Sequence, residues 1–168
     1  MNHLKNEDEK FLQLAYQEAL LGLKEGGIPI GAVLVVDNKV VATGRNKRIQ
    51  EHSMIKHAEM DCLENTKGKV LPEQMQVATL YTTLSPCYMC AGAVLLNQIP
   101  RLVIGENQTF EQSESLLTVK KIEMHVVNDT QCIQMMLTFI QKNPKLWGED
   151  IGLTEQQILT KYPSDFAR

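Results

Sequence analysis

The chain is predicted to fold as an α/β protein, a three-layer α/β/α sandwich around a mixed five-stranded sheet. Apolar residues recur at helical spacing in several segments, and short apolar runs of strand length lie between them. After a first β-hairpin the two kinds of segment alternate, which is typical of a sheet covered by helices. The length of 168 residues suits one such domain, so residues 1–168 are expected to form a single domain.

The first segments indicate a helix followed by a hairpin. Residues 8–25 place apolar side chains at helical spacing, and Gly26-Gly27 ends the run. Beyond Pro29, residues 30–36 form a continuous apolar stretch of strand length. The polar residues 37–39 predict a turn, and residues 40–42 return the chain as a second strand.

The remaining elements alternate between helix and strand, with no linker or repeat between them. They are expected as a helix at 56–66, a strand at 77–83, a helix at 86–97, a strand at 101–105, a short helix near 113–120, a strand at 123–127, and helices at 129–142 and 154–161. This order predicts a mixed sheet with helices on both faces.

Composition narrows the class of protein. Hydrophobic residues make up 43% and charged residues 22%, and no apolar run approaches the roughly 18 residues that span a membrane. The polar residues 1–10 do not resemble a signal peptide, so a cytoplasmic location is expected. Four cysteines are too few for a disulfide framework. The net charge of −3 argues against a nucleic acid as the main partner.

Two short motifs contain the residues that a metal centre needs. They are His57-Ala58-Glu59 and Pro86-Cys87-Tyr88-Met89-Cys90. Cys87 and Cys90 are three positions apart, so their sulfurs project from one face of a first helical turn, where the helix dipole favours thiolates. Pro86 is expected at the start of that helix, where its missing N–H costs nothing. His57 and the two cysteines suit a Zn²⁺ ion that keeps its fourth tetrahedral position open for water.

Glu59 is the expected proton shuttle of this centre. Two thiolates and an imidazole cancel the charge of the ion, so the ion alone is a weak activator of water, and a nearby carboxylate is needed. Residues i and i+2 point apart in a helix, so His57 must lie at the start of its helix for both side chains to face the metal.

Two other interpretations of the cysteine pair were weighed. A structural zinc site would need a fourth ligand, for which the candidates are Cys62, Cys132, His52 and His125. Cys62 and Cys132 are interpreted as small core residues, and neither histidine has a suggestive spacing. A thioredoxin-like redox pair would leave His57 and Glu59 unexplained. A catalytic zinc therefore fits the pattern best.

Further motifs extend over residues 11–152. They are Gly27-Ile28-Pro29-Ile30-Gly31-Ala32, Leu80-Tyr81-Thr82-Thr83-Leu84-Ser85-Pro86-Cys87, Ile99-Pro100-Arg101, Gly105-Glu106-Asn107 with Phe110, and Trp147-x-Glu149-Asp150-Ile151-Gly152. Together with H-x-E and P-C-x-x-C, they resemble the cytidine-deaminase superfamily and, within it, the fungal-type cytosine deaminases. The resemblance implies a homodimer that converts the small free base cytosine to uracil and ammonia, a step of pyrimidine salvage. Zinc-bound hydroxide would attack C4, and Glu59 would deliver protons to N3 and to the departing amine.

The resemblance also implies a substrate pocket. Asn46 would hydrogen-bond the polar edge of the base, the backbone around Ala58 would contact the ring, and Asp150 would accept from the amine or a ring N–H. Phe110 and Trp147 would form apolar walls. Residues 153–168 extend past the point where the fungal-type chains end.

Two features favour related substrates instead. The fungal-type enzymes have glycine where this chain has Ala58, which is usual in purine- and nucleoside-acting relatives, and Tyr88 replaces a smaller acidic residue. A guanine deaminase is thus an alternative, with pocket volume set by Ala58, Tyr88, Phe110 and Trp147.

A tRNA adenosine deaminase is supported by the positive charges of Arg45-Asn46-Lys47-Arg48, although a solvated loop is the favoured interpretation of that run. Residues 139–168 contain as many acidic as basic side chains, so no basic face is expected. A zinc-stabilised interaction domain without activity is the non-enzymatic alternative, and Glu59 argues against it.

Overall fold

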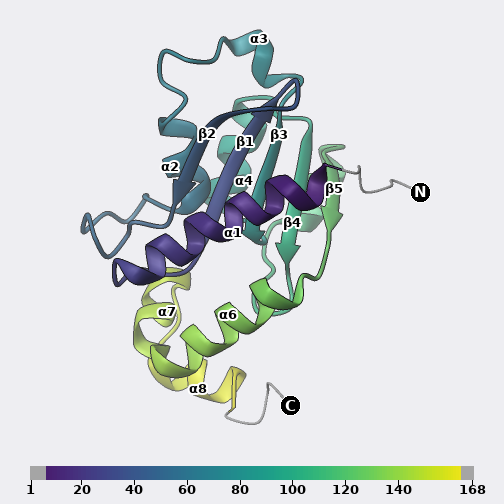
Figure 1. Ribbon diagram of the computed structural model, residues 1–168. Helices are drawn as coiled ribbons and strands as arrows, with labels where there is room; N and C mark the ends of the chain where they lie inside the picture. Colours follow the sequence, from purple (N-terminus) through teal and green to yellow (C-terminus); the bar gives the residue numbers. More distant parts are fainter. Residues whose placement is uncertain (1–6, 164–168) are drawn as a thin grey trace.

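The computed structural model describes residues 7–163 and shows a sheet with helices on both faces (Figure 1). The elements are α1 (Asp8–Lys24), β1 (Gly31–Val36), β2 (Lys39–Arg45), α2 (Ala58–Glu64), α3 (Pro72–Met75), β3 (Thr79–Leu84), α4 (Tyr88–Leu96), β4 (Arg101–Glu106), α5 (Glu114–Val119), β5 (Glu123–Val126), α6 (Thr130–Lys142), α7 (Pro144–Ile151) and α8 (Glu155–Lys161).

The sheet has five strands in the order β2-β1-β3-β4-β5. β1 is antiparallel to both β2 and β3, whereas β3, β4 and β5 are parallel to one another. The predicted mixed five-stranded sheet is therefore confirmed. One end of the sheet is formed by the start of β1, the end of β2 and the carboxyl ends of β3 and β4. In Figure 1, α7 approaches this end.

Successive side chains of β1 point to opposite faces of the sheet, and both faces are buried. Val33 and Val35 pack with Phe11 of α1, while Leu34 on the opposite face belongs to the larger core that includes Ala58 of α2. α1 crosses the front of the sheet in Figure 1, and α2 and α4 lie behind it. The three-layer sandwich is thus confirmed.

Gly44 lets α2 lie directly against β2. A Cβ atom at this position would come within 2.2 Å of the backbone nitrogen of Cys62 and 2.7 Å of the carbonyl oxygen of Ala58. Both atoms belong to the backbone of α2, so only glycine permits this approach. The close packing fixes the depth at which α2 presents its first residues.

Several predicted boundaries need correction. β2 runs over Lys39–Arg45 rather than 40–42, because the turn is only two residues, Asp37 and Asn38, with φ angles of 48° and 59°. α4 begins at Tyr88 with Cys87 as its N-cap, so Pro86 precedes the helix instead of occupying its first turn.

Two helices were not predicted. α3 is a single turn that begins at Pro72. α7 begins at Pro144 and ends at its C-cap Gly152, which has a φ angle of 74°. α7 is only eight residues long, and its existence depends on the burial of Trp147 in the core.

Two expectations concern the ends of the chain. The predicted extension 153–168 is described as far as residue 163 and contains α8, whereas residues 1–6 of the polar N-terminal stretch lie outside the described part. Within residues 7–163, no helix combines the length and apolar character needed to cross a membrane. The cytoplasmic location and the single domain stay predictions.

Candidate metal centre and active site

The three expected metal ligands come together at the starts of two helices. His57 is the N-cap of α2, with an extended backbone (φ −70°, ψ 162°), and Cys87 is the N-cap of α4. The Sγ atom of Cys87 lies 3.6 Å from Nδ1 of His57 and 3.6 Å from Sγ of Cys90. The prediction that His57 lies at the start of its helix is confirmed. Because His57 is outside the helix proper, its side chain need not point away from that of Glu59, as residues i and i+2 do within a helix.

The spacing of these atoms fits a tetrahedral zinc ion. Zn–S bonds of about 2.3 Å and Zn–N bonds of about 2.05 Å, at tetrahedral angles, separate two sulfurs by about 3.8 Å and a sulfur from a nitrogen by about 3.6 Å. The ligand atoms of His57, Cys87 and Cys90 all lie within 4.8 Å of one another. Among residues 7–163, no fourth histidine, cysteine or carboxylate joins this group. Three ligands leave one tetrahedral position for water.

The other cysteines lie apart from this cluster. Cys62 and Cys132 are buried in the core, as interpreted from the sequence, and burial raises the pKa of both thiols well above the usual range. Neither they nor His52 and His125 close the site.

The ligand side chains change one another's pKa values. Contact with Cys90 lowers the pKa of Cys87 to about 4 against the opposing effect of burial, and His57 lowers it further. The pKa of Cys90 is raised by its contact with Cys87 and by burial. Burial lowers the pKa of His57, but Cys87 and nearby carboxylates reverse this and raise it to about 9. A pair of sulfurs that favours one thiolate is suited to a cationic metal.

Glu59 is buried beside these ligands. Its side chain is 3% exposed, and the hydroxyl of Thr82 donates a hydrogen bond of 3.3 Å to Oε1. Burial, followed by the negative charge of Cys87, raises the pKa of Glu59. A carboxyl group with raised proton affinity next to a metal can take up and release a proton.

A small cavity of about 20 Å³ lies at this centre. Its lining combines ligand residues, Glu59 and several predicted pocket residues, namely Ile30, His57, Glu59, Leu84, Ser85, Cys87, Phe110, Trp147 and Asp150. The volume suffices for about one water molecule, so side chains must move before a larger molecule can enter.

Apolar walls and a carboxylate bound the cavity. Phe110 and Trp147 meet edge to face, with ring centroids 5.7 Å apart and an interplanar angle of 82°. Oδ1 of Asp150 lies 3.6 Å from Nε2 of His57, and the side chain is 2% exposed. Burial raises the pKa of Asp150, although the positive charges of His57 and Arg48 partly oppose this.

Some predicted residues lie elsewhere. Asn46 and Ala58 are fully buried but are not among the lining residues of the cavity. Nδ2 of Asn46 is buried and makes no hydrogen bond within the described chain; its amide favours the charged form of Asp150, but the two groups are not in hydrogen-bond geometry. Tyr88 is 57% exposed and is not among the lining residues of the cavity, so its part in setting the pocket volume stays a prediction.

Sequence reasoning missed other residues at this site. Ile30, Leu84 and Ser85 line the cavity, and Thr82 contacts Glu59. Their signal was present, since all four belong to the motifs that carry the family resemblance. Arg48, which contacts Asp150, had no such signal.

The three cations of the run 45–48 are all paired. Arg45 contacts Glu18 and Glu25 of the α1 region, and Lys47 contacts Asp61 of α2. Arg48 lies 3.6 Å from Asp150 and is 12% exposed. The interpretation of this run as a solvated loop is therefore wrong, and its charges are neutralised within the molecule.

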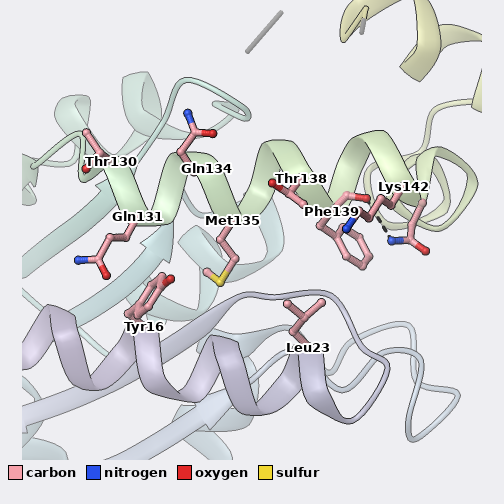
Figure 2. A pocket seen from close by; sticks show the side chains of 10 residues that line it. Tyr16, Leu23, Thr130, Gln131, Gln134, Met135, Thr138, Phe139 and Lys142 are labelled. Carbon is pink, nitrogen blue, oxygen red and sulfur yellow. Dashed lines mark hydrogen bonds between the residues drawn. The ribbon is translucent and has the colours of Figure 1, made fainter. Parts of the chain in front are cut away.

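A larger hollow lies away from this chemistry. The cavity has a volume of about 530 Å³. It lies between α1 and α6, where Tyr16 and Leu23 face Met135, Phe139 and Lys142 (Figure 2). Its lining has no cysteine, histidine or carboxylate. Size alone therefore does not identify the active site, and the ligand cluster marks the smaller cavity.

Comparison with known proteins decides the family. The sequence model of the cytidine and deoxycytidylate deaminase zinc-binding region matches residues 5–106, which include all three ligand residues and Glu59. The chain belongs to this family. The deaminase is a hydrolase that acts on a C–N bond, and its cofactor is zinc.

The relatives of the deaminase are named for different substrates. Cytosine deaminase of Candida albicans is 46% identical over 147 residues, covering 87% of this chain and 97% of the relative. The tRNA-specific adenosine deaminase of Bacillus subtilis is 39% identical over 99 residues, 59% of this chain and 62% of the relative. A crystal structure of a protein in complex with 2,6-diaminopurine superposes with a TM-score of 0.70 at 16% identity, covering 84% and 85% of the two chains, which shows the fold alone.

Proposed function

We propose that the deaminase acts on a free nucleobase and converts cytosine and water to uracil and ammonia. The observation that carries this proposal is the 46% identity to the cytosine deaminase of Candida albicans over nearly the whole of that protein. The lining of the small cavity supports it, because the aromatic rings of Phe110 and Trp147 and the carboxylate of Asp150 surround the ligand residues there.

Each residue of the metal centre has a proposed role. His57, Cys87 and Cys90 would hold the zinc ion, which when bound supplies a water activated for attack on C4 of the base. Glu59 would accept a proton at a carboxylate oxygen and deliver it to N3. Glu59 would then take the proton of the hydroxyl added at C4 and pass it to the amine. The C4–N bond breaks, ammonia leaves as a neutral product and the oxygen stays as the carbonyl of uracil.

The pocket residues would orient the base. Asp150 would accept a hydrogen bond from the exocyclic amine or a ring N–H, while Asn46 and the backbone around Ala58 would contact the remaining polar edge. Phe110 and Trp147 would cover the faces of the ring and exclude water. A planar base offers few atoms, so each polar edge needs a placed partner and each face an apolar wall.

A tRNA adenosine substrate is the second candidate, favoured by the relative in Bacillus subtilis. Base flipping into such a site requires cations that are free to contact the RNA backbone. The cations of the run 45–48 are instead held by carboxylates of the same chain. This pairing supports the free base over the RNA.

Release of ammonia from a panel of substrates tests the proposal. The panel contains cytosine, cytidine, adenine, guanine and a tRNA anticodon stem-loop, each with the zinc-loaded protein. We expect cytosine to have the highest kcat/KM. Faster release from guanine, or from the tRNA, would replace cytosine with that substrate.

We further propose that the deaminase is a homodimer. Large apolar side chains are exposed on the segments that carry the metal ligands, with Met54 70% exposed and Leu96 82% exposed. The dimer is implied by the resemblance to the fungal-type cytosine deaminases, and the partner would cover side chains of this kind. Sedimentation equilibrium should give twice the chain mass of 19.0 kDa, and the substitution Leu96→Arg should weaken the association. A wild-type protein that sediments as a monomer would rule the dimer out.

A further inference from the structure

Arg48 joins two parts of the chain that meet at the proposed substrate pocket. Its guanidinium Nη2 donates a hydrogen bond of 3.0 Å to the carbonyl oxygen of Glu149, near the end of α7. Its Nε lies 3.6 Å from Oδ1 of Asp150. Its backbone N–H donates a hydrogen bond of 3.0 Å to Oδ1 of Asn46. One residue thus contacts both polar groups that were assigned to the base, although 104 positions separate them in the chain.

These contacts determine which atoms of the two groups remain available. Because Oδ1 of Asn46 accepts from the Arg48 backbone, the amide must present Nδ2 as its other atom. Nδ2 of Asn46 and Oδ1 of Asp150 are both buried, and neither makes a hydrogen bond within residues 7–163. The contacts of Oδ1 of Asp150 with Arg48 and His57 are ion pairs at 3.6 Å and do not supply a hydrogen bond. A buried donor and a buried acceptor without a hydrogen bond are costly in a folded protein, and such groups are found where a ligand completes them.

The chemistry of the guanidinium suits this arrangement. Its planar fork can donate to the Glu149 carbonyl while another edge faces the Asp150 carboxylate, which a single ammonium cannot do with the same geometry. A cation at the C-terminal end of α7 also interacts favourably with the helix dipole. The Arg48 side chain is 12% exposed, so solvent screens these interactions only partly.

We propose that Arg48 is a positioning residue for the deamination: its guanidinium holds Asp150 in the register that the base requires, while its backbone N–H, which any residue at this position would supply, orients Asn46. The inference rests on the proposed function, because it assigns Asn46 and Asp150 to the substrate. Arg48 itself does not touch the reacting atoms. Its loss should therefore weaken substrate binding more than it slows the chemical step.

Binding is tested without turnover in a Glu59→Gln background, which retains the metal ligands. Calorimetry would measure the Kd of cytosine for the zinc-loaded Glu59→Gln protein, with and without Arg48→Met. We expect Arg48→Met to raise Kd by about 10- to 100-fold, the range for losing hydrogen bonds of a charged group. An unchanged Kd would overturn the positioning role.

Steady-state kinetics in the active protein separate positioning from simple destabilisation. Arg48→Met should raise KM by more than it lowers kcat, with the zinc content unchanged. Arg48→Lys keeps the charge but not the fork, so it should restore less than half of the lost kcat/KM; full restoration would reduce the role to charge alone. If Arg48→Met does not fold, Arg48→Lys takes its place in the binding measurement and should still raise Kd.

The matched control is Arg45→Met. Arg45 belongs to the same run, has the same side chain and pairs with Glu18 and Glu25 away from the cavity. Its loss should leave Kd and KM unchanged. Failure of the proposed function looks different, because the wild-type protein would then release no ammonia from cytosine and the Glu59→Gln protein would not bind it. In that case the binding measurement is repeated with the base that the panel selects. An equal Kd of this base for the Glu59→Gln proteins with and without Arg48→Met would still refute the inference.

Discussion

Burial changes the proton affinity of the side chains that would perform the deamination. Glu59 and Asp150 are both almost fully buried, and loss of solvation raises the pKa of each carboxyl group. Cys87 and His57 influence the pKa of both groups, but Asp150 also has Arg48 and the amide of Asn46 beside it, which favour its charged form. The first environment favours a group that carries a proton, and the second favours a group that accepts a hydrogen bond as a carboxylate.

Replacement of Glu59 by alanine should abolish turnover without releasing the metal. The proton shuttle is lost while His57, Cys87 and Cys90 are unchanged, so kcat should fall by at least about 10³-fold. Ammonia release and zinc content, measured on the same sample, check this. Glu64→Ala on the exposed side of α2 is the control and should keep full activity. Retained turnover in Glu59→Ala would remove its proposed role.

Replacement of Asp150 by alanine should reduce kcat/KM for cytosine by about 10- to 100-fold, because a charge-assisted hydrogen bond to the base is lost. The zinc content should stay at one ion per chain, since Asp150 lies beside His57 without being one of the three ligand residues. Unchanged kinetics in this variant would refute the proposed pocket. Glu155→Ala, an exposed carboxylate of α8, provides the comparison.

At the scale of elements, the site depends on how closely α2 packs on β2. Gly44→Ala would place a Cβ atom against the backbone of Cys62 and Ala58, which cannot move without moving α2. We expect a loss of about 1–3 kcal/mol in the free energy of unfolding, together with weaker zinc binding. Gly92 on α4 has nothing within 4 Å of its added Cβ, so Gly92→Ala should be neutral or stabilising by about 0.5–1 kcal/mol. Equal unfolding curves for the two variants would contradict this account.

The metal should also connect two helices, because its ligands lie at the starts of α2 and α4. Removal of zinc with a chelator should abolish activity and lower Tm, and zinc at 100 times its Kd corresponds to about 2.7 kcal/mol of stabilisation. Scanning calorimetry with and without the chelator measures the shift. The Tm of His57→Ala should not respond to the chelator, and a wild-type Tm that is equally insensitive would count against the site.

The sequence predicted the strands and long helices well, because their apolar patterns agree with their burial. It also predicted the ligand set, since three residues at short spacings need little more than two helix starts to meet. α7 was not predicted, because an eight-residue helix with Gly148 inside it forms through packing. The directions of the Tyr88 and Arg48 side chains were not predicted either. The direction of a side chain at a helix start or in a loop is fixed by contacts with residues distant in sequence.

At the scale of the whole molecule, charge pairing disfavours binding to a polyanion. The net charge is −3, and the cations of the run 45–48 already have carboxylate partners in the chain. Affinity for tRNA should therefore be weak, with a slope of log K against log salt shallower than about −2. Fluorescence anisotropy over a range of salt concentrations measures this slope. A steep dependence would favour the tRNA substrate and exclude the free base as the main one.

The chain order of the site residues has a consequence for biosynthesis. The last of the three ligand residues is Cys90, whereas Trp147 and Asp150, which close the cavity, come about 60 positions later. At a translation rate of roughly 5–20 residues per second, these 60 positions take roughly 3–12 s to be made. During that interval the nascent ligand set is open to the surrounding metal pool, so loading can precede closure.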